Sequence, residues 1–460
     1  NSDTIKLASG GVCAAKGFQA AGIHCGVRKS RAKRDLALIW SEKRAAAAAV
    51  YTSNLVKGAP LTVTRNNIAD GYAQAVICNS GNANTCNADG IEIAEAMCAL
   101  TGDALGIPAS DVIVASTGVI GQKLSIEPIA AGIPALTAAL GHTCEEAAEA
   151  IMTTDTVMKS VAVSFEIGGV ECRMGGIAKG SGMIHPDLAT MLVFITTDCA
   201  AAPEMLRAAL SADVKSTFNM VSVDGDTSTN DTVILLANGL AGNPMITEKG
   251  EDYDAFCKAL SMVTTAFARK IGGDGEGCTA LLEMKVEGAS SREQAKVLAK
   301  SVVCSSLVKA AMYGHDANWG RILCAMGYAG VSFDPEKVDI FFESSAGSIQ
   351  IVKNGTGAGF DEELATRIIS EPEVTIRADL KEGSASATAW GCDLTYEYVA
   401  FDDFGTHADD TVFVEVFRRV GADVRYIVGE FLHATFGVAH LKGELLDVYR
   451  GEEVLADYLL

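Results

Sequence analysis

Short apolar runs and longer amphipathic stretches alternate along most of this chain. The short runs are rich in β-branched residues and predict strands at residues 72–78, 111–116, 161–165, 170–174, 232–237, 279–286, 338–342, 348–352, 374–378 and 385–389. The longer stretches place apolar residues at helical spacing and predict helices at residues 91–105, 125–140, 144–152, 203–210, 252–270, 292–312 and 362–369. Strands and helices mixed in this order predict a layered α/β or α+β fold.

The pattern changes at about residue 400. An acidic loop at 402–410 is followed by a strand-like alternating run at 411–417 and by apolar residues at helical spacing at 426–446. We therefore expect residues 400–460 to form an atypical C-terminal extension of the main fold.

Composition narrows the class of protein. The 460 residues are 49% hydrophobic and 21% charged, which is typical of a globular chain with a sizeable core. The net charge of −21 disfavours nucleic acid and anionic membranes as partners. Thirteen cysteines without a Cys-x-x-Cys pair indicate free thiols in a reducing compartment. We find no run approaching the ~18 apolar residues of a membrane span, and no signal peptide in the first residues. We therefore expect the protein to be located in the cytoplasm.

The segment from Lys179 to Thr190 carries the most specific chemistry. A glycine-rich loop, Lys179-Gly-Ser-Gly-Met-Ile-His-Pro-Asp-Leu-Ala-Thr190, runs directly into the apolar strand pattern at 191–195. If the chain cut itself between Ala189 and Thr190, the freed α-amine would stand beside the threonine hydroxyl as its own base. The alternative is an ordinary loop entering a strand, and the local pattern alone favours that interpretation.

Four residues are candidates for binding or catalysis, each with a plain alternative. Thr117 and Gly118 end a buried strand, where a hydroxyl and a backbone N–H can face an oxyanion or simply form a turn. Lys179 can hold a substrate carboxylate or remain a solvated surface lysine. Glu276, in the glycine-rich stretch 272–277, can receive an ammonium group or belong to the C-cap of the preceding helix.

A metal site has weaker support. The segment 216–232 is dense in oxygen-bearing residues, but it lacks the glycine and glutamate positions of a calcium loop. We favour a polar turn that satisfies its own backbone there. His185 can act as an acid or base, although loop histidines are more often merely exposed, and no metal-ligating constellation is visible.

Taken together, the chain resembles the ornithine acetyltransferase family, the glutamate N-acetyltransferases of arginine biosynthesis. Eight segments across roughly residues 8–399 carry the resemblance in family order: Asn79-Ser-Gly-Asn-Ala-Asn84, Ser116-Thr-Gly-Val-Ile-Gly121, Met152-Thr-Thr-Asp-Thr156, Lys179–Thr190, Ser222–Thr232, Asp274-Gly-Glu-Gly277, Asp316–Ile322 and Ala389–Thr395. The resemblance implies an αββα-type layered fold, shared with certain self-processing aminopeptidases.

The resemblance also implies that the chain cleaves itself between Ala189 and Thr190. Residues 1–189 would become an α chain and residues 190–399 a β chain, and the two would assemble as α2β2. Thr190 would be the nucleophile.

The remaining site residues also follow from the resemblance. It implies that Thr117 and Gly118 form the oxyanion hole. Thr153, Lys179, Thr190 and Glu276 match the family's substrate-contacting positions.

The implied reaction is ping-pong acetyl transfer from N2-acetylornithine to glutamate through an acetyl-threonine ester. It needs no cofactor, and some family members also accept acetyl-CoA as the donor. We expect Lys179 to pair with the α-carboxylate common to both amino acids, and Glu276 to face the side-chain ammonium of ornithine.

The C-terminal end departs from the family pattern. The family's C-terminal substrate-binding Asn falls on Asp402 and its terminal Thr falls near His407, so we carry neither contact over. Two other functions therefore stay open at this point. One is a self-processing threonine aminopeptidase or amidase that uses water as acceptor, and the other is an uncleaved, inactive homologue with a binding or regulatory role.

Overall fold

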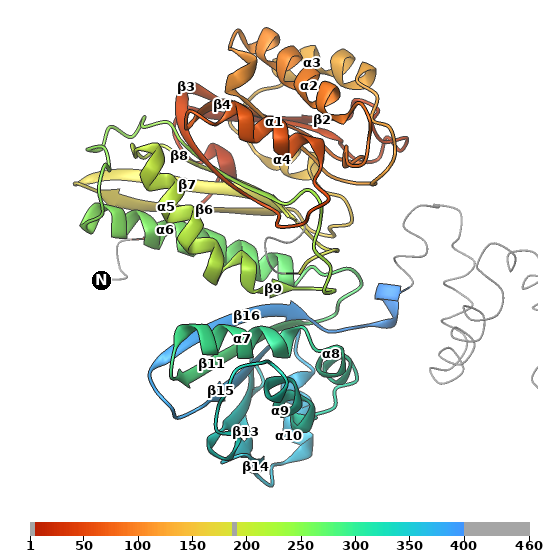
Figure 1. Cartoon of the computed structure of the whole chain (residues 1–460), viewed down its shortest axis with the longest axis vertical. Helices are drawn as coiled ribbons and strands as arrows, with labels where there is room; N and C mark the ends of the chain where they lie inside the picture. Colours follow the sequence, from red (N-terminus) through yellow and green to blue (C-terminus); the bar gives the residue numbers. More distant parts are fainter. Residues whose placement is uncertain (1–4, 186–190, 400–460) are drawn as a thin grey trace, which may run out of the picture. The chain divides into compact units, whose positions relative to one another are not determined.

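Two β-sheets organise the described part of the chain (Figure 1). The structure is a computed structural model that describes residues 5–185 and 191–399. The chain divides into two units, residues 1–398 and 399–460, and the description that follows concerns the first. Helices pack against both sheets, which confirms the layered, mixed α/β class expected from the sequence.

The first sheet has nine strands in the order β1-β6-β7-β8-β10-β3-β4-β5, with β2 also paired to β3. Their bounds are β1 (Lys6–Ala8), β2 (Phe18–Ile23), β3 (Leu36–Tyr51), β4 (Tyr72–Asn79), β5 (Val112–Ser116), β6 (Lys159–Ile167), β7 (Val170–Lys179), β8 (Leu192–Thr197) and β10 (Thr232–Ala237). The pairs β4–β5 and β8–β10 are parallel. The 161–165 and 170–174 runs form the antiparallel pair β6–β7 expected from the sequence.

Both faces of this sheet are buried at β8 and β10, which explains why these two strands are largely apolar. In β8, Val193 and Ile195 belong to one hydrophobic cluster, whereas Leu192 and Phe194 belong to another on the opposite face. Helices cover the sheet: α1 (Ala59–Asn67), α2 (Gly90–Leu105), α3 (Glu127–Ala138), α4 (Glu145–Ala150), α5 (Pro203–Asp213) and α6 (Glu251–Gly272). A strand covered on both faces has no solvent side, so the alternating polar pattern is lost.

The second sheet has seven strands in the order β14-β13-β12-β15-β11-β16-β9. Its strands are β9 (Val221–Ser222), β11 (Leu281–Ala289), β12 (Asp339–Ser344), β13 (Gly347–Lys353), β14 (Thr356–Gly357), β15 (Glu373–Asp379) and β16 (Ala385–Cys392). Four helices accompany it: α7 (Arg292–Val303), α8 (Ser306–Tyr313), α9 (Trp319–Gly327) and α10 (Glu362–Ile369). Helix α7 packs on β11 and β16, and α10 packs on β12.

Helix α6 connects the two sheets, because it contacts β6 and β7 of the first and β9 and β16 of the second. Its buried side chains include Phe256, Leu260, Val263, Phe267 and Ile271, which recur at the three- and four-residue spacing of one helix face. Among the helices of the described ranges, none is long and apolar enough to cross a membrane.

One predicted helix is wrong, and several elements were not predicted, among them β2, α1, α9 and the long strand β3. The single helix expected at 292–312 is two helices, since Ser305 breaks it and caps α8 by accepting from Val308 N–H at 3.3 Å. Strand β3 escaped prediction because its alanine run, Ala45–Ala49, has high intrinsic helix propensity. In the fold that run pairs with β10 on one edge and β4 on the other, and this pairing outweighs the local preference.

Candidate active site

Thr117, which follows the end of β5, pairs with the loop at residues 79–84. Thr117 N–H donates to Asn79 O at 3.0 Å, and Thr117 pairs with Asn82 in an isolated antiparallel bridge. Gly118 has a φ of 132° and lies so close to Gly81 that any side chain there would overlap the backbone of Gly81 and Asn82. Only glycine fits this position, so the Thr117–Gly118 backbone is held in one conformation against the 79–84 loop.

Asn230 attaches a third motif to the same loops. Its side-chain amide donates to Ser116 O at 2.9 Å and to Ala83 O at 2.6 Å, and its carbonyl accepts from the Thr85 hydroxyl at 2.7 Å. Asn230 is buried, so these bonds satisfy backbone carbonyls that water does not reach. The segments around 79–84, 116–121 and 222–232 therefore meet at one place.

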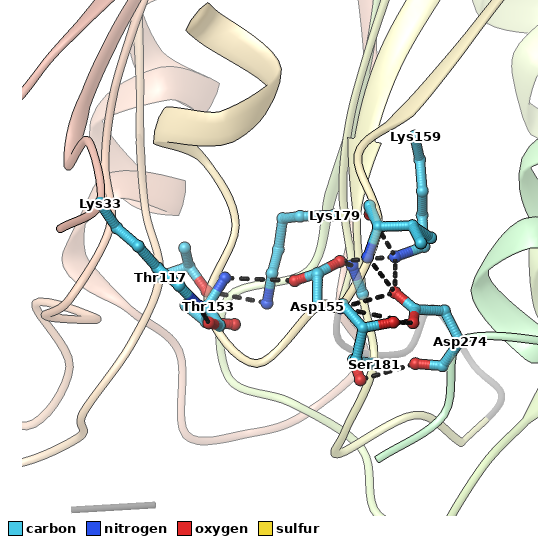
Figure 2. Close-up of polar contacts among 11 residues, drawn as sticks. Lys33, Thr117, Thr153, Asp155, Lys159, Lys179, Ser181 and Asp274 are labelled. Atoms are coloured by element: carbon cyan, nitrogen blue, oxygen red, sulfur yellow. Dashed lines mark hydrogen bonds and ion pairs between the residues drawn. The ribbon is translucent and has the colours of Figure 1, made fainter. Parts of the chain in front are cut away.

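Lys179 is a buried cation that lies next to Thr117. It is the last residue of β7, its side chain is 2% exposed, and its Nζ donates to the Thr117 hydroxyl at 3.4 Å (Figure 2). Burial lowers the pKa of the Lys179 ammonium, whereas the nearby Asp155, Asp231 and Glu276 carboxylates raise it. The alternative of a solvated surface lysine is excluded by this burial.

Asp155 links Lys179 to the Thr153 segment. Its carboxylate accepts from Thr153 N–H at 3.1 Å, from Gly180 N–H at 2.7 Å and from Lys159 Nζ at 2.7 Å. Burial opposes ionisation, but the charges of Lys179 and Lys159 together with the Gly180 N–H hold the pKa of Asp155 below its usual value. The side chain of Asp155 thus stays an anion between two buried lysines.

Lys159 joins Asp155 to Asp274, and we call these three residues the ion array. The Nζ of Lys159 lies 2.7 Å from Asp155 Oδ1 and 2.5 Å from Asp274 Oδ2, and Lys159 itself is fully buried (Figure 2). The Asp274 carbonyl accepts from the Ser181 hydroxyl at 2.6 Å, and Glu276 N–H donates to Ser181 O at 3.1 Å. The ion array therefore fixes the loop that carries Glu276 against the residues that follow Lys179.

A Lys159→Met variant is expected to lose about 3–5 kcal/mol of stability, because it leaves two buried carboxylates without their cation. The matched control is Lys123→Met, since Lys123 is 79% exposed and pairs with Asp89 only at the surface; such a pair is worth about 0–1 kcal/mol. Urea unfolding of both variants measures the difference. Equal stability losses would show that the ion array contributes no more than a surface pair.

The described chain resumes at Met191, directly after the predicted cleavage position. Ala189 and Thr190 lie outside the described residues, but Met191 N–H donates to Asp231 Oδ1 at 2.9 Å. Leu192 stands opposite Lys179 in the β7–β8 ladder. The chain immediately after Thr190 is therefore at the end of the sheet where Lys179 lies.

Asp231 is the carboxylate that accepts from Met191 N–H. It is 1% exposed, and its Oδ2 has no hydrogen-bond partner within residues 5–185 and 191–399. Burial raises the pKa of Asp231 well above its usual range, against the lowering effect of Met191 N–H and Lys179. The sequence did not single this residue out as a catalytic candidate.

Other sequence candidates have structural roles. The Asp224 carboxylate accepts from Asp226 N–H within the predicted polar turn, and also from the N–H groups of Met183 and Ile184 in another loop. His185 contacts the Ser222 hydroxyl at 3.2 Å, and its neighbours in the chain, 186–190, are not described. Asn318 caps α9 by accepting from Arg321 N–H, so part of the 316–322 motif serves the helix start.

The structure therefore gathers Thr117, Gly118, Thr153, Lys179 and Glu276, whereas Asp402 and His407 lie outside the described residues. Sequence reasoning did not identify Lys159, and it assigned no role to Asp274 within the 274–277 motif. Their pairing joins residues 115 positions apart, and no local pattern signals such a contact.

Comparison with known proteins identifies the family of the chain. A family model described as the ArgJ family matches residues 19–403, which is more than four-fifths of the chain. The chain belongs to the ArgJ family. Its relatives include the Arginine biosynthesis bifunctional protein ArgJ of Symbiobacterium thermophilum, which is 50% identical over 394 residues, covering 85% of this chain and 97% of the relative.

Two further comparisons involve members of the ArgJ family. The Arginine biosynthesis bifunctional protein ArgJ of Caldanaerobacter subterraneus subsp. tengcongensis is 47% identical over 86% of this chain and 98% of its own length. A crystal structure of Arginine biosynthesis bifunctional protein argJ from Bacillus halodurans is 44% identical, covers 46% of this chain and 97% of that chain, and has a TM-score of 0.43. The match to the family model ends at residue 403, so most of the 400–460 extension lies beyond it.

Proposed function

We propose that this ArgJ-family enzyme of arginine biosynthesis transfers an acetyl group from N2-acetylornithine to glutamate by a ping-pong mechanism, and that Thr190 carries the acetyl group between them. The products are ornithine and N-acetylglutamate. Acetyl-CoA is a further candidate donor. No cofactor is part of the mechanism.

The first half-reaction acylates the enzyme. The Thr190 hydroxyl oxygen attacks the acetyl carbonyl carbon, and the α-amine of Thr190 takes the hydroxyl proton. The tetrahedral oxyanion accepts hydrogen bonds from the Thr117 hydroxyl and Gly118 N–H. The carbon–nitrogen bond to ornithine then breaks, the α-ammonium of Thr190 returns the proton to the leaving amine, and an acetyl-threonine ester remains.

The second half-reaction reverses these steps with a different amine. The amine of glutamate attacks the ester carbonyl, the same oxyanion hole holds the intermediate, and the carbon–oxygen bond to Thr190 breaks. The proton lost by the glutamate amine passes through the α-amine of Thr190 to its hydroxyl. Lys179 pairs with the α-carboxylate of either amino acid, and Glu276 faces the side-chain ammonium of ornithine.

The contact between Lys179 and Thr117 is the observation that carries this proposal. Because the Thr117 hydroxyl oxygen accepts from the Lys179 ammonium, its own hydrogen is free to donate elsewhere. A neighbouring positive charge strengthens such a donor toward an oxyanion. In addition, Gly118 N–H sits in a backbone that the 79–84 loop holds fixed, so this donor needs no reorganisation.

The organisation of the chain forms part of the same proposal. Cleavage between Ala189 and Thr190 would yield an α chain of residues 1–189 and a β chain of residues 190–399 with its 400–460 extension, assembled as α2β2 in the cytoplasm. Strand β7 ends at Lys179 and pairs with β8, so the two chains would stay joined through the sheet after cleavage.

Incubation with N-acetylornithine, with and without glutamate, tests the function. Without glutamate we expect one ornithine to be released per chain, after which the reaction stops at the acetyl-enzyme. With glutamate we expect continuous turnover to N-acetylglutamate, measured by chromatography of the products. Release of acetate at a rate that does not depend on glutamate would instead identify an amidase that uses water as acceptor.

A further inference from the structure

A concentration of positive charge borders the active site of this acidic protein. Five of the seven residues 28–34, which we call the basic segment, are Arg or Lys, whereas the whole chain has 37 basic and 58 acidic residues. The basic segment connects β2 to β3. The buried Asp35 carboxylate fixes its start by accepting from the N–H groups of Cys25, Gly26 and Arg28.

Two cations of the basic segment reach the site loops. Lys33 Nζ donates to Thr153 O at 3.5 Å, and Arg28 Nη2 donates to Met152 O (Figure 2 shows Lys33 at Thr153). The aliphatic part of Arg28 also lies against Gly81, so closely that a side chain at Gly81 would meet Arg28 Cγ. Since Gly81 in turn lies against Gly118, Arg28 borders the proposed oxyanion hole, and Lys33 borders Thr153.

Arg28 and Lys33 form no ion pair within residues 5–185 and 191–399. Arg34 pairs with Glu146 and Glu149, but among the residues that the structure describes no carboxylate forms an ion pair with Arg28, Lys29, Arg31 or Lys33. Arg28 Nε is buried and has no hydrogen-bond partner within the same ranges. Burial lowers the pKa of the Arg28 guanidinium, and the more distant Asp35 and Asp155 only partly offset this effect. A bound anion would supply the missing partner.

The proposed reaction requires such an anion site. Ornithine and glutamate share an α-amino acid head but end in opposite charges, an ammonium and a carboxylate. Glu276, which suits the ammonium, would repel the carboxylate, and Lys179 is already assigned to the α-carboxylate. A second cationic subsite is therefore needed for the acceptor alone.

We propose that Arg28 and Lys33 form the subsite that binds the side-chain carboxylate of the acceptor amino acid, an inference that rests on the acetyl-transfer function proposed above. The Lys33 ammonium keeps N–H groups beyond the one on Thr153 O, and the Arg28 guanidinium keeps donors beyond the one on Met152 O. The donor amino acid does not use this subsite. Arg28 and Lys33 thus determine specificity in the second half-reaction.

The test compares two acceptors on a Lys33→Gln variant, which is chosen because Lys33 is exposed and its loss should not disturb folding. One assay follows transfer to glutamate, and the other follows exchange of isotope-labelled ornithine into N-acetylornithine, which needs no side-chain carboxylate. We expect KM for glutamate to rise and kcat/KM to fall about tenfold, because the variant loses one hydrogen bond to a charged group. The rate of ornithine exchange should stay close to that of the unmodified enzyme. The Lys33→Arg variant should restore glutamate transfer.

Arg34→Gln is the matched control, because it removes one charge from the same segment at a side chain already paired with Glu146 and Glu149. We expect it to leave the glutamate KM unchanged. An unchanged glutamate KM in Lys33→Gln, or an equal loss in both assays, would refute the subsite. Absence of ornithine exchange in the unmodified chain would refute the acetyl-transfer function itself, and the subsite with it.

Discussion

A Thr190→Ala chain is expected to remain one uncleaved band of 47.9 kDa on a denaturing gel and to transfer no acetyl group. Removal of the hydroxyl removes the group that both self-cleavage and acetyl transfer require in the proposed mechanism. Activity should therefore fall to the background of the assay. The measurement combines the gel with an assay of N-acetylglutamate formation.

Thr190→Ser is the control for this prediction, since serine keeps the hydroxyl and, after cleavage, the adjacent α-amine. We expect it to be cleaved and to retain measurable activity. If Thr190→Ala transferred the acetyl group at a rate comparable to the unmodified enzyme, another residue would be the nucleophile. If neither the unmodified chain nor Thr190→Ser were cleaved, the inactive, uncleaved alternative would be favoured.

Thr117→Ala should lower kcat by about 10²–10³, the usual effect of deleting one oxyanion-hole donor. The loss should fall on kcat and not on KM, because the hydroxyl donates to charge that develops only in the transition state. Steady-state kinetics at varied N-acetylornithine and glutamate concentrations measure the two constants. Chain cleavage should be monitored in the same preparation, so that kcat is expressed per cleaved enzyme.

Thr117→Ser provides the matched control, because it keeps the hydroxyl that accepts from Lys179 at 3.4 Å. Its kcat should stay within about tenfold of the unmodified enzyme, well above that of Thr117→Ala. A Thr117→Ala enzyme with normal kcat and raised KM would contradict the oxyanion role. It would place Thr117 among the residues that bind the ground state.

Elements with a strong local pattern were predictable from the sequence. Helix α6 was expected at 252–270 and spans Glu251–Gly272, because its apolar face recurs at helical spacing without interruption. Strand β10 was predicted with its bounds, since a short β-branched run has few alternatives. The β3 strand and the break at Ser305 depend on partners or on capping, which a window of local sequence does not weigh.

The site residues likewise divide into those that sequence motifs identified and those that only the tertiary structure shows. Thr117, Gly118, Lys179 and Glu276 were identified because their motifs resemble those of a known family, and the structure gathers their segments. The ion array was not predicted, because Lys159 and Asp274 meet only through the tertiary fold. The basic segment was not singled out either, since a run of charge in a loop is usually a solvated surface and only its contact with Thr153 indicates otherwise.

Mass spectrometry of the enzyme after incubation with N-acetylornithine alone tests the central claim most directly. We predict two fragments, of which the one beginning at Thr190 gains the mass of one acetyl group while one ornithine is released per chain. The acetyl group should map to Thr190 and should disappear when glutamate is added. An intact chain that carries no acetyl group, or an acetyl group on any other residue, would contradict the account.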